Sequence, residues 1–306
     1  MKVAFLFPGQ GAQKPGMLSQ LPSNPIVQAT LAEACNVLGK NIFFLDSEEA
    51  LLSTVNVQLA LLVHEVVSAR LLLAEGAVAD AVAGHSVGAF AAAVIAGSLT
   101  FADALSIVSL RGKLMGEAFC ANYGMAVVIG IDEKNVRKLV ETVEKVYIAN
   151  INAPDQITLA GSKQGLAGAL ELCRAAGAQK VQYVQVSVPS HCELLQPVGE
   201  ALTARLVDMT VKNARIPYVG NCRARLLRKG KDIERDLALG VAHSVRWYDM
   251  TSLLVELGVE LFVEAGPGQV LTTMAAKAFP NIRAIALESS GLSSAALLVK
   301  RTHGVE

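Results

Sequence analysis

One serine in the sequence stands between two glycines, in the stretch Gly84-His85-Ser86-Val87-Gly88. An apolar run precedes it and small apolar residues follow, a pattern that predicts a sharp turn from a strand into a helix. Such a turn exposes the serine hydroxyl at a helix N-terminus, where backbone N–H groups stabilise a developing negative charge. The pattern therefore favours a nucleophile over a serine that only caps the helix.

A serine hydroxyl needs a base before it can act as a nucleophile, and the chain has five histidines. We expect His64 to lie on the surface or in the core of a long helix, and His303 to lie in a frayed tail. The side chain of His85 diverges from its neighbour at a sharp turn and is expected to pack. His191 and His243 both lie in loops that can face another domain. Position alone leaves the base open between these two.

An arginine lies on or beside the apolar face of the helix that begins near Phe101. The guanidinium of this residue, Arg111, cannot lose its proton and is costly to bury unless it meets an anion. Asp103 or Glu117 could supply a structural carboxylate. The alternative is a substrate carboxylate, and a bidentate pair with it would select a dicarboxylic acyl group.

The elements that must position these residues alternate between strand and helix patterns. Strands are expected at residues 2–9 and 77–86, and helices at 56–76, 87–97 and 101–119. This alternation indicates a parallel sheet covered by helices, which is an α/β fold.

The segment from about residue 124 to 188 has a different order of elements. Its patterns read strand, helix, strand, strand, helix, strand, which is the βαββαβ order of a ferredoxin-like unit. Strand and helix alternation then resumes to the C-terminus. We therefore predict a small domain at 123–190 inserted into a large domain formed by 1–122 and 191–306.

The composition excludes several classes of partner and site. Acidic and basic residues are equal at 27 each, so no overall charge favours nucleic acid or an anionic membrane. No apolar run reaches the ~20 residues of a membrane span, and five widely spaced cysteines suggest neither disulfides nor a metal site. We expect a soluble, cytoplasmic protein. The basic stretch 223–231 could meet an acidic partner, although a solvated loop is the simpler interpretation.

Several short motifs, in order and across nearly the whole chain, resemble the malonyl-CoA:acyl-carrier-protein transacylases. The motifs are FPGQGAQ, VQLALL, GHSVGAF, RGKLM, INAPDQITLAG, VPSHC, VRW and EAGPGQVL. The resemblance implies a hydrolase-like large domain with an inserted ferredoxin-like domain. It also implies malonyl-CoA as substrate, an acyl carrier protein as partner, and neither a bound cofactor nor a metal.

The resemblance assigns roles to individual residues. It makes Ser86 the acylated nucleophile and His191 of VPSHC its base, which resolves the choice of histidine. A backbone carbonyl at or beside Gly240 would orient that histidine. The N–H groups of Gln10 and Val87 would form the oxyanion hole.

Arg111 of RGKLM would bind the free carboxylate of the malonyl group. A residue directly after the glycine-serine turn, Ala89, narrows the resemblance. Ala89 stands where many transacylases of fatty-acid synthesis have an acidic residue. Together with other stretches, it makes the chain most similar to the malonate decarboxylase epsilon subunit, which loads the carrier subunit of that enzyme. The alternatives are the same transfer in fatty-acid or polyketide synthesis, a serine hydrolase, or a non-catalytic docking subunit.

Overall fold

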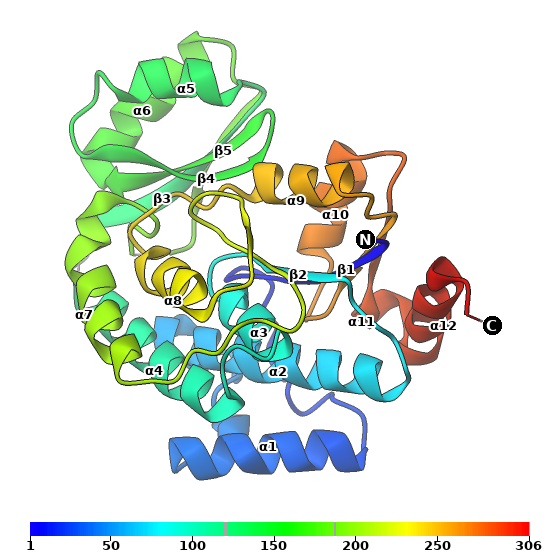
Figure 1. The fold of residues 1–306 in the computed structure, drawn as a ribbon. Helices are drawn as coiled ribbons and strands as arrows, with labels where there is room; N and C mark the ends of the chain where they lie inside the picture. The colour runs from blue at the N-terminus through cyan, green and yellow to red at the C-terminus, as the bar shows by residue number, and fades with distance from the viewer. Residues whose placement is uncertain (119–121, 187, 306) are drawn as a thin grey trace.

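A computed structural model describes residues 1–118, 122–186 and 188–305 of the chain. The chain forms two sheets, a large one at the centre and a small one that lies over one end of the molecule (Figure 1). Helices cover both faces of the large sheet, which confirms the predicted α/β class with a parallel sheet and a second, smaller unit.

The large sheet has the strand order β10-β9-β1-β2-β7-β8. Its strands are β1 (Val3–Phe7), β2 (Ala81–Gly84), β7 (Tyr218–Val219), β8 (Leu226–Leu227), β9 (Leu261–Glu264) and β10 (Arg283–Ala286). All pair in parallel except β8, which forms an antiparallel hairpin with β7. Every residue of β1 is buried, as expected for a central strand of a sheet covered on both faces.

The helices divide between the two faces of this sheet. On one face, alternate residues of β1 pack on α2, α3 and α4, and on the other face they pack on α9 and α10. The helices outside the small unit are α1 (Pro25–Leu38), α2 (Thr54–Ala74), α3 (Gly88–Ile95), α4 (Phe101–Ala118), α7 (Gln196–Val207), α8 (Gly230–Leu239), α9 (Trp247–Glu256), α10 (Val270–Ala278), α11 (Leu287–Ser290) and α12 (Leu292–His303). Short 3-10 turns lie at Ile42–Phe44, Ala50–Leu52 and Glu193–Leu195.

Helix α2 is long and apolar enough to span a membrane by length and composition alone. Most of it is buried inside the molecule, between α1, α3 and α4. The core helix of a globular domain passes the same test, so α2 is explained by its place in the core.

The small sheet is antiparallel and has the order β4-β5-β3-β6. Its elements follow the predicted βαββαβ order: β3 (Tyr123–Ile129), α5 (Glu133–Val140), β4 (Val146–Ala153), β5 (Gln156–Ser162), α6 (Lys163–Ala175) and β6 (Lys180–Val184). Both helices pack on one face of the sheet around their own apolar cluster. The boundaries at 122/123 and 190/191 remain a prediction.

The small sheet is joined to the large unit along β4. The loop before α9 adds one parallel bridge to this strand, in which the Val245 N–H donates to the Ala149 carbonyl (2.9 Å) and the Ile151 N–H donates to the Val245 carbonyl (2.9 Å). The Ser244 hydroxyl also donates to the Ile148 carbonyl at 2.6 Å. These bonds fix the open face of the small sheet above the C-terminal ends of β1 and β2.

The C-terminal region differs from its expected frayed state. His303 lies in the last turn of α12, where its Nε2 is 3.0 Å from Asp80 Oδ2, and Lys2 Nζ donates to the Thr302 carbonyl. The prediction of a frayed tail around His303 was therefore wrong, because α12 packs on α2 and β1. The described cysteines, Cys35, Cys173, Cys192 and Cys222, are free, and Cys120 lies outside the described residues.

Candidate active site

Ser86 lies on a sharp turn between β2 and α3, as the glycine pattern predicts. Its φ of 56° is in the left-handed region, which is strained for a residue with a side chain. Both flanking glycines are required by close approach. A Cβ on Gly84 would lie 2.1 Å from the Gly88 backbone, and one on Gly88 would lie 2.3 Å from the Phe7 carbonyl oxygen. The turn therefore fits only because both positions lack a side chain.

A buried network of hydrogen bonds stabilises this turn. The Ser86 N–H donates to Asn221 Oδ1 (3.0 Å), and Asn221 Nδ2 donates to the Gly84 carbonyl (2.9 Å). Asp236 fixes Asn221 in turn, because its carboxylate accepts from the Asn221 N–H (3.0 Å) and from the Tyr218 hydroxyl (2.9 Å). The strained turn is thus tied to the end of β7 and to α8.

His191 contacts the Ser86 hydroxyl directly. Its Nε2 lies 2.7 Å from Ser86 Oγ, and its Nδ1 lies 2.7 Å from the Gly240 carbonyl oxygen. A carbonyl can only accept, so Nδ1 carries the proton and Nε2 is left to accept from the serine hydroxyl. This is the tautomer that a general base needs.

Burial keeps this histidine neutral. Desolvation, together with the nearby Arg111 charge, lowers the pKa of His191 to about 3. The side chain is only 3% exposed. His191 is therefore unprotonated, and able to take a proton, at any pH near neutrality.

The other histidines lie away from the serine hydroxyl. His243 is exposed and faces a separate cavity, while His85 Nε2 contacts Asn152 Oδ1 (3.1 Å) and its ring packs against Trp247. His64 Nδ1 lies 3.3 Å from the Ser68 hydroxyl within α2. Of the two histidines that sequence position left open, the structure brings His191 to Ser86.

Arg111 is buried beside the nucleophile, with 3% of its surface exposed. Its Nη2 donates to Ser86 Oγ at 3.2 Å, and its Nη1 donates to Gln58 Oε1. Neither Asp103, which bonds Thr100, nor any other carboxylate of the described residues forms a salt bridge with it. Desolvation lowers the pKa of Arg111 to about 10, so the group is still charged at neutral pH and lacks a counter-ion.

Two backbone N–H groups face the same space. Gln10 follows β1 and Val87 precedes α3, and these parallel strands are neighbours whose ends meet at one edge of the sheet. Within the described part of the chain, neither N–H has an internal hydrogen-bond acceptor. Two free donors beside a nucleophile are the arrangement that binds an oxyanion.

All these groups border a cavity of about 270 Å³ between the two sheets. Gln10, Ser86 and Arg111 lie on its large-sheet side, whereas Asn152 and Thr158 of the small sheet line the opposite wall. A cavity of this size that places a serine, a neutral histidine and a cation together can hold and activate an acyl group that carries a negative charge. Among the described residues, no three His, Cys, Asp or Glu side chains gather as metal ligands.

Reasoning from the sequence missed two residues of this site. Gln58 was seen only as part of an apolar helix, yet it is fully buried and directs the Arg111 guanidinium. The feature of the sequence that could have identified Gln58 is a single amide side chain within the apolar run VQLALL of α2. Asn221 was not considered, although an amide just after a central parallel strand lies at the edge of the sheet where sites form.

Comparisons with known proteins agree with this arrangement. The acyl transferase domain family matches residues 4–301. The malonyl CoA-acyl carrier protein transacylase of Escherichia coli K12 is 36% identical over 303 residues, covering 96% of this chain and 98% of that protein. The enzyme of the same name from Bacillus subtilis is 34% identical and covers 94% of this chain and 93% of its own length.

Solved structures show the same similarity. The malonyl CoA-acyl carrier protein transacylase of Coxiella burnetii superposes with a TM-score of 0.93 at 30% identity, covering 99% of this chain and 98% of its own. A malonyl-transacylase solved with a type II polyketide acyl-carrier protein has a TM-score of 0.91 at 33% identity, covering 99% and 100%.

The fold and the site together define an acyltransferase. The chain belongs to the acyl transferase domain family and, within it, to the malonyl CoA-acyl carrier protein transacylases.

Proposed function

We propose that this protein transfers a malonyl group from malonyl-CoA to the thiol of an acyl carrier protein, through a malonyl ester of Ser86. The observation that carries the proposal is the pair of contacts at Ser86 Oγ, with His191 Nε2 at 2.7 Å and Arg111 Nη2 at 3.2 Å. Among the described residues, no carboxylate forms a salt bridge with this arginine. The first contact supplies a base, and the second supplies a cation for an acyl group with a free carboxylate.

In the first half of the reaction, His191 Nε2 takes the proton of Ser86 as Oγ attacks the thioester carbonyl carbon. The N–H groups of Gln10 and Val87 stabilise the resulting oxyanion, each by about 3 kcal/mol at the usual magnitude. When the intermediate collapses, the C–S bond breaks and the CoA sulfur takes the proton back from His191. Malonyl-Ser86 remains.

The second half reverses these steps with a different thiol. The carrier thiol gives its proton to His191 and attacks the ester carbonyl. The C–O bond then breaks and Ser86 recovers its proton. The carbonyl of Gly240 keeps the proton on His191 Nδ1 throughout, so the same tautomer serves both halves.

The malonyl carboxylate pairs with Arg111 while the ester exists. Gln58 holds one arm of the guanidinium, and this orients the group before substrate arrives. A dicarboxylic acyl chain is therefore favoured over an acetyl chain, which would leave a buried cation without a partner.

The finer proposal is that the acceptor is the carrier subunit of a malonate decarboxylase. It is supported by Ala89, which is buried and lines a small space shared with Ser86 and Arg111. A residue without charge there leaves Arg111 free of a protein counter-ion. The same transfer in fatty-acid or polyketide synthesis is the second candidate, because one similar transacylase was solved with a type II polyketide acyl-carrier protein. We infer a cytoplasmic location and no requirement for a bound cofactor.

The test is incubation of the full chain with labelled malonyl-CoA and, separately, with carrier proteins from each of these pathways. We expect label on Ser86 and its transfer to a carrier thiol, and the preferred carrier identifies the pathway. Ser86→Ala should carry no label. Free malonate released without transfer would indicate a hydrolase, and no label on the wild-type chain would exclude the transferase.

A further inference from the structure

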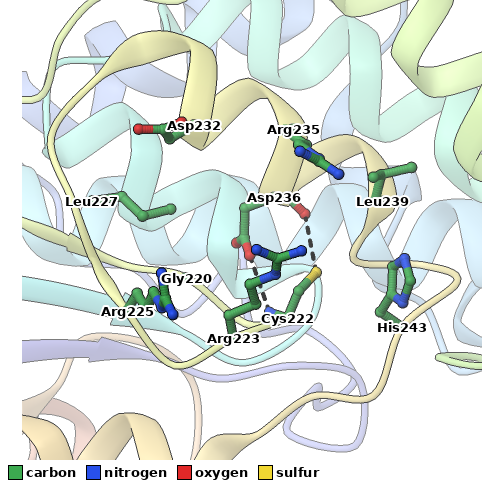
Figure 2. Close-up of a pocket in the computed structure, with 10 residues that line it drawn as sticks. All are labelled: Gly220, Cys222, Arg223, Arg225, Leu227, Asp232, Arg235, Asp236, Leu239 and His243. Carbon is green, nitrogen blue, oxygen red and sulfur yellow. Dashed lines mark hydrogen bonds between the residues drawn. The ribbon is translucent and has the colours of Figure 1, made fainter.

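A second cavity, of about 430 Å³, lies between the β7–β8 hairpin and α8 (Figure 2). It shares no lining residue with the malonyl cavity, because Asp236 and the end of β7 separate the two. Arg223 and Arg225 reach it from the hairpin loop, and Arg235 reaches it from α8. None of the roles proposed above uses this cavity.

The lining of this cavity has three arginines and two aspartates, Asp232 and Asp236, which leaves an excess of positive charge. Within the described part of the chain, none of the three guanidinium groups forms a salt bridge. The carboxylate of Asp232 points away from Arg223 and Arg235 (Figure 2). Asp236 is committed to the hairpin, since its oxygens accept from Tyr218, Asn221 and the Cys222 N–H. In a chain with zero formal charge, this cavity attracts anions.

Hydrogen bonds order the backbone of the hairpin loop that contains Arg223 and Arg225. The Gly220 N–H donates to the Arg225 carbonyl (2.9 Å), and the Cys222 N–H donates to Asp236 Oδ1 (3.0 Å). Ala224, between the two hairpin arginines, has a φ of 47° and so turns the loop sharply at that point. Binding of a ligand would therefore cost the conformational entropy of side chains but not that of the loop backbone, which favours binding.

The walls of the cavity are not purely polar. Leu227 and Leu239 contribute apolar surface, and the exposed imidazole of His243 lies at the end beside Leu239 (Figure 2). Guanidinium groups bind phosphate by paired hydrogen bonds, whereas apolar side chains and a ring accommodate a flat base. The volume lies within the range of cavities that hold small molecules.

We propose that this cavity binds a nucleoside phosphate, with the phosphate on Arg223, Arg225 and Arg235 and the base against Leu227, Leu239 and His243. Two sources share this chemistry, a free nucleotide and the nucleotide end of a coenzyme. The proposal is independent of acyl transfer, so the binding assay below does not depend on the proposed function.

Titration calorimetry of the full chain with adenosine 3′,5′-bisphosphate, with CoA and with inorganic phosphate tests the site. We expect saturable binding of the bisphosphate below about 1 mM, weakened by salt. The double variant Arg225→Ala/Arg235→Ala should raise its Kd by about tenfold or more. Arg228→Ala is the matched control, because Arg228 is exposed on the same segment but does not line the cavity.

The outcomes separate the alternatives. A KM that rises in the double variant for malonyl-CoA but not for malonyl-pantetheine identifies the coenzyme as the source. Unchanged KM values in a double variant that binds the bisphosphate more weakly identify a free nucleotide. Equal affinity for inorganic phosphate and the bisphosphate would overturn the nucleoside assignment. No saturable binding, or equal binding by the double variant and Arg228→Ala, would overturn the site.

Discussion

At the scale of single residues, the Ser86 hydroxyl contacts a neutral imidazole and a charged guanidinium, to which we assign different parts of one acyl group. His191 is neutral because it is buried, and Arg111 is charged although it is buried. The charge of Arg111 disfavours protonation of His191, so Arg111 supports the neutral state that a base needs.

Replacement of Arg111 by alanine tests its role in selecting the acyl group. We expect kcat/KM for malonyl-CoA to fall roughly 10²-fold, because a buried carboxylate would lose its only cation. Activity with acetyl-CoA should fall far less or rise. Steady-state kinetics with both thioesters measure the ratio, and Arg174→Ala, in an exposed pair with Glu171, is a control. An unchanged preference would make Arg111 structural.

The two loop histidines give a paired test of the base. His191→Ala should lower the rate of Ser86 acylation by about 10²–10⁴-fold, because the hydroxyl proton would have no acceptor. His243→Ala should leave the acylation rate at saturating malonyl-CoA nearly unchanged, since that side chain lines the other cavity and not the one that contains Ser86. Single-turnover labelling measures both, and the reverse pattern would reject His191 as the base.

At the scale of elements, the conformation of the turn at Ser86 depends on three segments that are distant in sequence. The turn after β2, the end of β7 and α8 are joined through Asn221 and Asp236. The strained φ of Ser86 persists because this network supports it from outside the turn.

Asn221→Ala removes two hydrogen bonds to the turn, those with Ser86 and Gly84. We expect the free energy of unfolding to fall by about 1–3 kcal/mol, and kcat to fall while the KM for malonyl-CoA changes little. Urea denaturation and steady-state kinetics measure the two effects. Asn213→Ala is the control, because Asn213 also bonds a backbone N–H but lies away from the site. A normal kcat in Asn221→Ala would contradict the positioning role.

Much of this arrangement follows from local pattern. The glycines around Ser86 and the alternation of strands and helices predict the turn, the parallel sheet and the inserted βαββαβ unit. The pairing of Gln58 with Arg111 joins residues 53 positions apart, and no local pattern encodes it. Helix α5 ends at Val140 although the polar stretch after it has helical composition, because that stretch forms turns. Local sequence could not decide whether His191 or His243 contacts Ser86. That choice required either the family resemblance or the three-dimensional structure.

At the scale of the whole molecule, one buried group opposes folding. Glu65 of α2 is fully buried, and neither of its carboxyl oxygens has a hydrogen-bond partner among the described residues. Burial, together with the nearby Glu264, raises the pKa of Glu65 well above its usual value. Glu264 itself accepts from the N–H groups of Leu271 and Thr272 at the start of α10.

Glu65→Leu should stabilise the protein, and more so at high pH. The folded state holds Glu65 neutral while the unfolded state ionises it above pH 4.5, so the cost of this residue grows as pH rises from that value. We expect a gain of about 1–3 kcal/mol at pH 8 and a smaller gain at pH 5. Urea denaturation at the two pH values measures it, with the exposed Glu75→Leu as control. A gain independent of pH would indicate packing alone.

The group that accepts the hydrogen bond from His191 Nδ1 is the main-chain carbonyl of Gly240, which limits the substitutions that can remove it. Because every amino acid has the same carbonyl, no single-codon change deletes this third partner, whereas one change removes the serine or the histidine. Under the proposed mechanism, a substitution at Gly240 can act only by displacing the main chain, since an added Cβ would lie 2.9 Å from the Asp236 carbonyl oxygen. Searches that look for an acidic third residue would pass over such enzymes.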